Sequence, residues 1–272
     1  MMATTSLFGF FSVLLAIPLL TTCSATPQAG SPAIGHEVRL ERAEYTSANG
    51  VTVLPMDVYI PAAPSGAGVI AVHGGGWLSG TRRMMRGFCK RLAANGTLCF
   101  APEYRLAPAD PWPAAYRDLR AAVSNIRRNA ATWGLDPKRL GGFGTSAGGN
   151  LAALLAATGD LNATASWSGP MDLTTILVQG CPCSSQVERY APTEASKLAA
   201  SPVSHVGPAT PPMLIINSED EIIPLAQAQE MAASLNAAGV SHRLIVVPGT
   251  RHAIAYFIRE VSVTVRWLES HL

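Results

Sequence analysis

The chain has 272 residues, of which 48% are hydrophobic and 14% are charged, and its formal net charge at pH 7 is +2. This composition excludes an intrinsically disordered protein, and the length is sufficient for a large domain with a substantial core. The 20 basic and 18 acidic residues are scattered along the sequence, so we expect no basic face and no nucleic-acid partner.

The first 35 residues have the composition of a targeting segment and a leader. The apolar run over residues 7–20 is too short to span a bilayer comfortably, and small residues follow it at Cys23-Ser24-Ala25. We therefore predict a signal peptide over residues 1–25, a flexible leader over residues 26–35, and a secreted, extracytoplasmic protein with no stable membrane span after processing. No Lys or Arg precedes the apolar run, and lipoprotein anchoring at Cys23 is the alternative.

Extended and helical patterns alternate along the rest of the chain. The extended patterns cover residues 36–47, 51–60, 68–73, 97–101, 139–143, 163–168, 213–217 and 243–247, and the helical patterns cover residues 83–95, 114–133, 147–158, 225–238 and 253–269. The turn signal Ala48-Asn49-Gly50 predicts an antiparallel hairpin at the start. The alternation that follows predicts right-handed crossovers and a mostly parallel sheet with helices on both faces, so the fold class is α/β, in a single domain over residues 36–272.

Residues 170–211, after the sixth strand, break this alternation. The stretch is rich in proline, with Pro170, Pro182, Pro192, Pro202, Pro208 and Pro211. An irregular connection of about forty residues is longer than loops in compact domains usually are, so we predict a functional insertion near the active site.

Four cysteines remain after the predicted cleavage, namely Cys89, Cys99, Cys181 and Cys183. An even number in an oxidising compartment favours disulfides, although three pairings are open. Free, buried Cys89 and Cys99 are the alternative. No metal site is predicted, because Cys181-Pro182-Cys183 has no second ligand pair at a suitable spacing.

A candidate nucleophile, Ser146, lies in the stretch GGFGTSAGGN over residues 141–150. It stands between an extended and a helical pattern, which is where Gly-x-Ser-x-Gly forms a nucleophile elbow. Gly144 and Gly148 leave room for the sharp turn, and the helix N-terminus directs free amides at negative charge that develops nearby. A plain glycine-rich turn is the alternative for the pentapeptide alone.

A second glycine-rich motif, HGGGW over residues 73–77, directly follows the extended pattern at residues 68–72. Successive glycine amides at a strand end can converge on one point and bind the oxyanion of a tetrahedral intermediate. One such loop after an early strand and one elbow after a later strand are what an acyl-transfer site requires. We expect the oxyanion hole to consist of the amides of Gly74, Gly75, Gly76 and Ala147.

With these motifs the chain resembles α/β-hydrolases of the hormone-sensitive-lipase-like and bacterial feruloyl-esterase-like carboxylesterase groups. The resemblance rests on HGGGW, YRLAP (residues 104–108), WPAAYRDLRAA (112–122) and GTSAGGN (144–150), and it extends from about Gly68 to the end. It implies the α/β-hydrolase fold and a Ser-acid-His triad that needs no metal or organic cofactor. Thr145 departs from the pattern, because many relatives carry aspartate there.

The resemblance assigns the catalytic base to His252, in VVPGTRHAIAY directly after the last strand. Three other histidines follow Ser146, and we expect them to lie outside the site: His205, His242 and His271.

The acid should follow the strand over residues 213–217, where Glu219, Asp220 and Glu221 are candidates. The family pattern of aspartate followed by two or three residues and then proline selects Asp220, ahead of Pro224. Asp172 is the alternative. Such a carboxylate holds the imidazole in the correct tautomer.

Together these residues predict a serine carboxylic-ester hydrolase with a Ser146-His252-Asp220 triad, acting on a small-molecule ester through an acyl-enzyme. Few residues precede the HGGGW motif, so we expect no N-terminal helical cap and an open cleft walled by the insertion. Short-chain acyl esters and esters of aromatic acids are the expected substrates. An amide hydrolase resembling kynurenine formamidase and a catalytically silent hydrolase-fold binding protein are the alternatives.

Overall fold

An eight-stranded sheet in the order β1-β2-β4-β3-β5-β6-β7-β8 organises the computed structural model, which describes residues 37–272. The strands are β1 (Val38–Thr46), β2 (Val53–Pro61), β3 (Gly68–Val72), β4 (Leu98–Pro102), β5 (Leu140–Thr145), β6 (Thr164–Trp167), β7 (Met213–Ser218) and β8 (His242–Val247). Strand β2 is antiparallel to β1 and β4, and all other neighbouring strands are parallel. The predicted α/β-hydrolase fold with an N-terminal hairpin is therefore confirmed, whereas the predicted signal peptide and leader lie outside the described residues.

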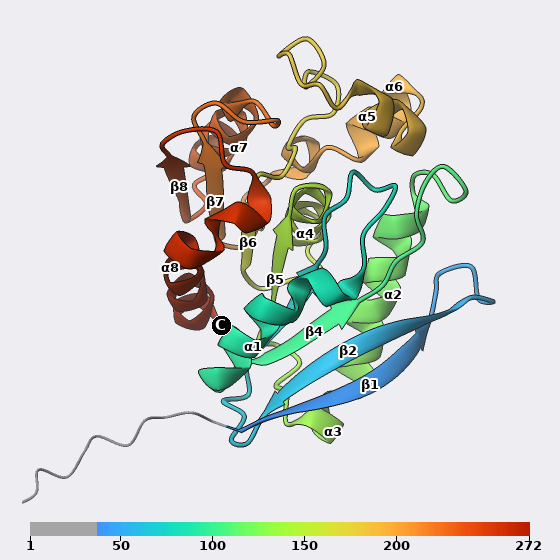
Figure 1. Ribbon diagram of the computed structural model, residues 1–272, viewed down its shortest axis with the longest axis vertical. Helices are drawn as coiled ribbons and strands as arrows, with labels where there is room; N and C mark the ends of the chain where they lie inside the picture. The colour runs from blue at the N-terminus through green and yellow to red at the C-terminus, as the bar shows by residue number, and fades with distance from the viewer. Residues whose placement is uncertain (1–36) are drawn as a thin grey trace, which may run out of the picture. The chain divides into compact units, whose positions relative to one another are not determined.

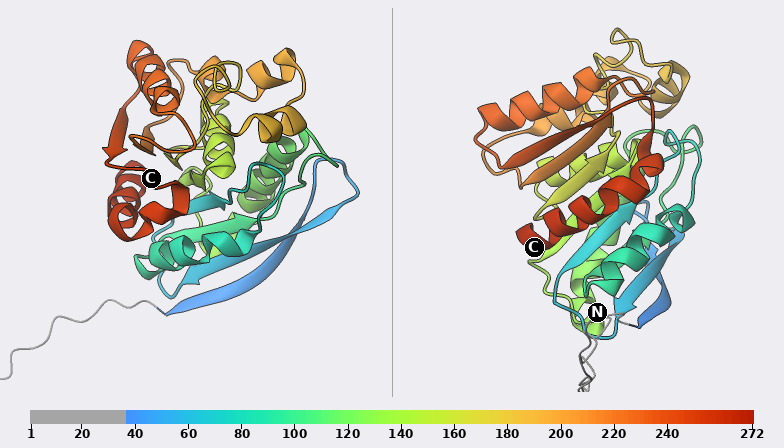
Figure 2. Two further views of the ribbon diagram at one scale, coloured as in Figure 1. Left: turned by 45° about the horizontal axis from the view of Figure 1, so that its top comes forward. Right: turned by 60° about the vertical axis from the view of Figure 1, so that its left-hand side comes forward.

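Helices cover both faces of this sheet (Figures 1 and 2). Successive side chains of a strand point to opposite faces, so Val69 and Ala71 pack with α1 and α8, while Ile70 and Val72 pack with α2, α4 and α7. The helices are η1 (Arg82–Met85), α1 (Arg86–Ala94), α2 (Ala114–Arg128), α3 (Ala130–Trp133), α4 (Ala147–Ala157), α5 (Ser184–Tyr190), α6 (Glu194–Ala199), η2 (Pro202–His205), α7 (Leu225–Ala237), η3 (Ala253–Tyr256) and α8 (Phe257–His271). None of the helices in the described part of the chain has the length and apolar character needed to cross a bilayer.

Two segments differ from the prediction. The helix expected over residues 114–133 is divided at Asn129 into α2 and α3, and the division brings the Trp133 indole to Glu41 of β1, to which its Nε1 donates at 3.1 Å. The insertion over residues 170–211 contains the short helices α5 and α6, which lie beyond one end of the sheet (Figures 1 and 2), and η2, which packs against α4 and α7. Helices this short have too few turns to show a periodic pattern in sequence.

Two disulfides are present within residues 37–272. One joins Cys89 of α1 to Cys99 of β4, and the other joins Cys181 to Cys183 within the insertion. The free-cysteine alternative for Cys89 and Cys99 is therefore wrong, because α1 packs directly against the strand that carries Cys99.

Candidate active site

Ser146 occupies the sharp turn between β5 and α4, with φ of 54° and ψ of −125°. Non-glycine residues rarely adopt a positive φ, so the surrounding structure must hold the turn in place. The Ser146 amide donates to the carbonyl of Trp167 at 2.8 Å. A Cβ on Gly144 would overlap the carbonyl oxygen of Gly148, and one on Gly148 would overlap that of Val72. The elbow therefore has the predicted strand-turn-helix setting, and its glycines are required by close backbone contacts.

The HGGGW loop lies directly beside this elbow, because Val72 at the end of β3 pairs with Gly144 of β5. A Cβ on Gly74 would lie 2.7 Å from the carbonyl oxygen of Thr145 and 3.2 Å from Ser146 Cβ. Within residues 37–272, no backbone carbonyl accepts from the amides of the four residues predicted for the oxyanion hole, Gly74, Gly75, Gly76 and Ala147. The loop thus brings unpaired donors next to the serine, as oxyanion binding requires.

Buried polar contacts hold the loop in this conformation. His73 is buried, its Nδ1 donates to the carbonyl of Gly74 at 2.8 Å, and its ring stacks on Tyr104 with centroids 4.3 Å apart. The Tyr104 hydroxyl donates to the His73 carbonyl at 2.8 Å. His73 Nε2 lies 3.5 Å from Glu103, which also pairs with Arg82 at 2.8 Å. Burial raises the pKa of Glu103, but contacts with His73 and Arg82 outweigh it, so this pKa lies below the usual value.

His252 follows β8 and lines the same cavity as Ser146. Its Nδ1 donates to Glu221 Oε2. The Glu221 side chain is fully buried, whereas the imidazole is 26% exposed. A buried carboxylate on Nδ1 leaves Nε2 free to act on a serine hydroxyl.

The structure corrects the predicted acid, because Glu221 and not Asp220 contacts His252. The amides of Glu219 and Asp220 donate to the carbonyls of Val247 and Gly249, which continues the contact between β7 and β8 and leaves both side chains exposed. After Ser218, the first side chain that this turn directs inward is that of Glu221. The predicted contact between Asp220 and His252 is therefore wrong, and the carboxylate that contacts the imidazole belongs to the next residue, Glu221.

The alternative acid, Asp172, is also wrong as the partner of His252. Its Oδ1 accepts from the amide and the hydroxyl of Thr174 at 2.8 Å and 2.6 Å, at the start of the insertion. Burial raises the pKa of Asp172, but hydrogen bonds, chiefly those from Thr174, together outweigh burial, so this pKa lies below the usual value. This carboxylate stabilises a turn and does not contact the imidazole.

The other three histidines contact nearby backbone carbonyls and do not line the cavity that holds Ser146. His205, His242 and His271 lie within hydrogen-bond distance of the carbonyls of Ala199, Val240 and Trp267, respectively.

The cavity at Ser146 has a volume of about 150 Å³. Its walls come from the HGGGW loop, the elbow, the insertion and the turns after β7 and β8, and consist of Gly76, Trp77, Ser146, Ala147, Pro170, Cys183, Gln186, Ile222, Ile223 and His252. Trp77 is supported from behind by Tyr190 of α5, whose ring stacks on it with centroids 4.5 Å apart. The insertion therefore forms part of the wall, as predicted from its position.

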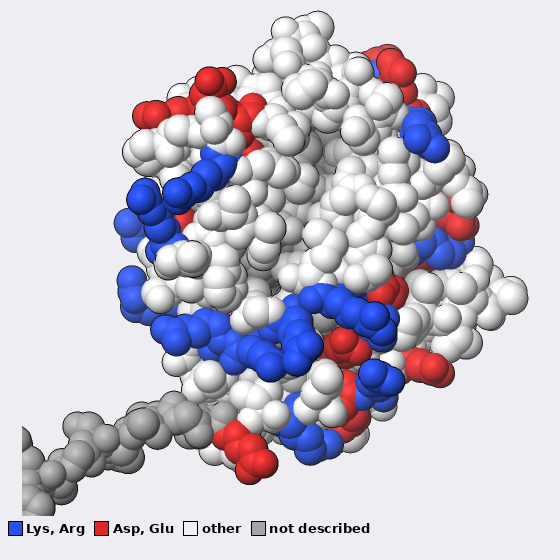
Figure 3. Space-filling view, viewed as in Figure 1, with Lys and Arg blue, Asp and Glu red and all other residues white. Residues whose placement is uncertain are grey.

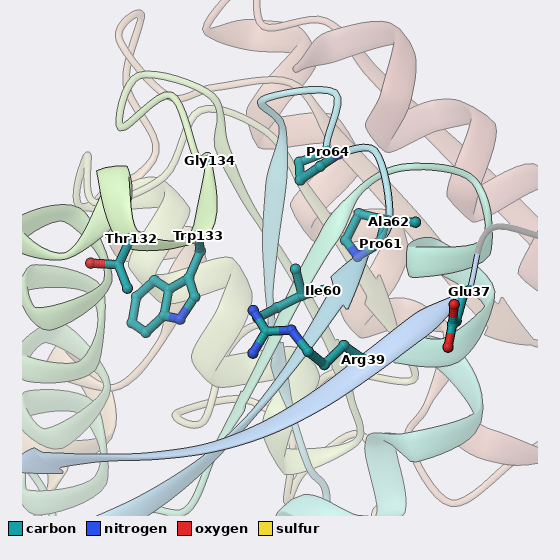
Figure 4. Close-up of a pocket in the computed structure, with 9 residues that line it drawn as sticks. All are labelled: Glu37, Arg39, Ile60, Pro61, Ala62, Pro64, Thr132, Trp133 and Gly134. Atoms are coloured by element: carbon teal, nitrogen blue, oxygen red, sulfur yellow. The ribbon is translucent and has the colours of Figure 1, made fainter.

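A larger cavity, of about 590 Å³, lies at the β1–β2 edge of the sheet (Figure 4). None of the predicted site residues lines it. Two of its lining side chains, Arg39 and Trp133, contact Glu41 at 2.9 Å and 3.1 Å. Of these two cavities, the smaller one is therefore the cavity that Ser146 and His252 line.

Basic side chains gather beside the hollowed part of one face, contrary to the scattered arrangement expected from the sequence. A row of Lys and Arg crosses the face shown in Figure 3, while the side chains around the hollow are mostly uncharged. In η1 and α1, Arg83, Arg86, Lys90 and Arg91 are exposed. Folding brings them together because they recur along adjacent helical turns.

Two buried amide side chains, Asn150 and Gln227, anchor the insertion and were not singled out from the sequence. Asn150, one turn after Ser146 on α4, donates through Nδ2 to the carbonyls of Pro170 and Ala200, at 2.9 Å and 3.0 Å. Gln227 of α7 accepts at Oε1 from the amides that follow Pro170, at 2.8 Å and 2.7 Å. For Asn150, the sequence signal that could have indicated this role was its position inside the GTSAGGN motif.

We expect the two disulfides to contribute differently. Cys89 and Cys99 are ten residues apart, and loss of this link in Cys89→Ala/Cys99→Ala should lower the free energy of unfolding by about 2–3 kcal/mol. Cys181 and Cys183 are two residues apart and close almost no loop, but Cys183 lines the cavity. Calorimetry and kinetics should show a lower Tm with unchanged kcat/KM for the first pair. Cys181→Ser/Cys183→Ser should instead leave Tm unchanged and alter kcat/KM. An altered kcat/KM for the first pair, or a lower Tm for the second, would contradict this expectation.

Comparison with known proteins agrees with this geometry. The BD-FAE family model matches residues 56–235. An ethyl acetate hydrolase from Pseudomonas putida is 30% identical over 234 residues, which cover 76% of this chain and 73% of that protein. Esterase LipQ from Mycobacterium tuberculosis is 28% identical over 221 residues, or 73% of this chain. The chain spans about half the length of LipQ, since the match covers 51% of that protein.

Solved structures show the same fold at low identity. An esterase from Pyrobaculum calidifontis superposes with a TM-score of 0.77 at 23% identity, and the match covers 88% of each chain. A bacterial heroin esterase gives a TM-score of 0.77 at 24% identity over 90% of this chain and 87% of that one. With the family match over residues 56–235, the elbow at Ser146 and the sheet that carries it, this chain belongs to the BD-FAE family and has the α/β-hydrolase fold.

Proposed function

We propose that the protein is a serine carboxylesterase in which Ser146 is the nucleophile, His252 the general base and Glu221 the acid of the triad. The observation that carries this proposal is the shared cavity of Ser146 and His252, with a buried carboxylate on Nδ1 of the imidazole. Esterases among the relatives of this chain support the reaction class.

In the first half of the reaction, Ser146 Oγ attacks the ester carbonyl while its proton passes to His252 Nε2. The oxyanion of the tetrahedral intermediate accepts from amides of the predicted oxyanion hole, which consists of Gly74, Gly75, Gly76 and Ala147. When this intermediate collapses, the alcohol leaves with the proton from Nε2 and an acyl-Ser146 remains. Water then attacks the acyl group by the same route, which releases the acid and restores the serine.

Glu221 acts on the imidazole and not on the substrate. Its carboxylate accepts the Nδ1 proton, which fixes the tautomer and leaves the Nε2 lone pair for Ser146. When Nε2 takes the serine proton, the imidazolium is stabilised by a carboxylate that is shielded from water.

The size of the cavity supports a small substrate group. Roughly 150 Å³ is the volume of a cavity that holds one benzene molecule. Trp77, Ile222 and Ile223 make its walls apolar, and His252 is its one titratable lining residue. We propose esters of short-chain acids or of a single-ring aromatic acid as substrates, and the relative named for ethyl acetate supports the short acyl group.

A panel of p-nitrophenyl esters of increasing acyl length tests this proposal. We expect kcat/KM to be highest for short acyl groups and to fall about tenfold or more when the chain exceeds the cavity, because a misfitting methylene costs ~1–3 kcal/mol. A feruloyl ester tests the aromatic acyl group, and N-formylkynurenine tests the amide-hydrolase alternative. Highest kcat/KM for long-chain esters would contradict the proposed substrate size, and highest kcat/KM for N-formylkynurenine would contradict the esterase.

The two disulfides within the described residues support the proposal that the protein works outside the cytoplasm. Disulfides persist in oxidising compartments and are rare in the cytosol.

A further inference from the structure

The carboxylate of Glu221 has a second oxygen, Oε1, that His252 does not use. Oε1 lies 2.9 Å from Ser168 Oγ and 2.9 Å from the amide nitrogen of Ser218, and it accepts from the Tyr256 hydroxyl. Three donors on one oxygen of a buried carboxylate stabilise its ionised form and restrict its rotation.

The Ser168 hydroxyl links the acid to the chain segment that carries His252. Its oxygen accepts from the amide of Ala253 at 2.9 Å, and the hydroxyl proton is then available to Glu221. Ser168 and Ala253 have φ of 52° and 50°, which are uncommon for non-glycine residues. One hydrogen bond thus joins two strained backbone positions, and one of them, Ala253, directly follows His252 in sequence.

The Tyr256 ring is held independently of its hydroxyl. The side chain is 1% exposed and packs edge-on against Trp167, with centroids 6.0 Å apart. Its hydroxyl also lies 2.9 Å from Ser168 Oγ. Burial raises the pKa of Tyr256, and the neighbouring Glu221 raises it further, so the phenol stays protonated and acts as a donor.

We propose that Tyr256 and Ser168 are positioning residues that hold Glu221 so that Oε2 faces His252 Nδ1. This inference rests on the proposed triad. A glutamate has one more rotatable bond than an aspartate, so its carboxylate needs additional restraint to stay in one orientation. The two hydroxyls supply this restraint, and Ser168 also fixes the distance between the acid and the imidazole-bearing loop.

A double-mutant cycle tests the proposal with a readout that a purely structural role would not produce. We expect Tyr256→Phe to lower kcat about tenfold or more with KM within about twofold, because a hydrogen bond to a charged group is lost while the ring remains. In a Glu221→Gln background, the same Tyr256→Phe change should lower kcat by less than about twofold, since no carboxylate remains to be positioned. Ser168→Ala should give the same pattern and serves as the second variant if Tyr256→Phe folds poorly.

Tyr116→Phe is the matched control, because the Tyr116 hydroxyl contacts Thr158 at 3.1 Å outside the site. Thermal unfolding of each variant checks that the fold is retained. Equal losses of kcat from Tyr256→Phe in both backgrounds would overturn the positioning role. Full activity in Tyr256→Phe and Ser168→Ala, together with an impaired Glu221→Gln, would overturn this inference alone, whereas full activity in Glu221→Gln would overturn the proposed triad as well.

Discussion

Replacement of Ser146 by alanine is expected to lower kcat by roughly 10⁴ to 10⁶, because the acyl-enzyme can no longer form. Alanine retains the Cβ and leaves the amide of residue 146 free to donate to Trp167, so the elbow should persist. Hydrolysis of a short-chain p-nitrophenyl ester measures the loss, and thermal unfolding checks the fold.

A fluorophosphonate probe gives a second measurement of the same prediction. The wild-type protein should form one adduct, located at Ser146 by mass spectrometry, and Ser146→Ala should form none. Ser270→Ala, which changes an exposed serine on α8, is the control and should label as the wild type does. An adduct on another serine, or no adduct on the wild type, would contradict the assignment, and the second result would favour a silent binding protein.

The second large loss of activity is expected on replacement of Glu221, and the neighbouring carboxylate Asp220 provides a matched control. Glu221→Gln should lower kcat by roughly 10³ to 10⁴, because a neutral amide no longer fixes the tautomer or stabilises the imidazolium. Asp220→Asn should leave kcat within about threefold of wild type, since that side chain is exposed and surface changes have small effects.

Steady-state kinetics on both variants, at several pH values, distinguishes the two carboxylates. A large loss in Asp220→Asn with a mild effect of Glu221→Gln would restore the acid selected by the family pattern. Large losses in both would show that the turn after β7 has to be intact for activity and that neither side chain can be assigned by substitution alone.

The order of the elements follows from the sequence because most of them have local signals. Strands β3 and β4 are short apolar runs, and α2 shows the apolar periodicity of a helix with one buried face. The insertion lacks such signals, since α5 and α6 have seven and six residues. Cysteine pairing also depends on the packing of α1 against β4, which is a tertiary contact.

The place of Ser146 was predictable because its neighbours carry backbone requirements, such as glycines that close contacts demand. That of His252 was predictable from the resemblance, because the residue directly follows the last strand. The position of the proposed acid, Glu221, was not predictable, because the alternation of side chains that holds within β7 ends with the strand. Beyond Ser218, the direction of each side chain depends on how the turn pairs with residues 247–249 of the next loop. Glu219, Asp220 and Glu221 are chemically similar, so sequence alone could not identify which one points inward.

The attachment of the insertion through Asn150 has a consequence for how this enzyme can diversify. Asn150 binds the carbonyls of Pro170, at the start of the inserted segment, and of Ala200, in its second half, and Asn150 itself lies one helical turn from Ser146. We therefore expect that the residues between these two carbonyls can be exchanged for those of a homologue, because the two hydrogen bonds would hold the new segment in the same position relative to Ser146. Selectivity for different esters can then evolve, or be engineered, while the reacting atoms stay where they are.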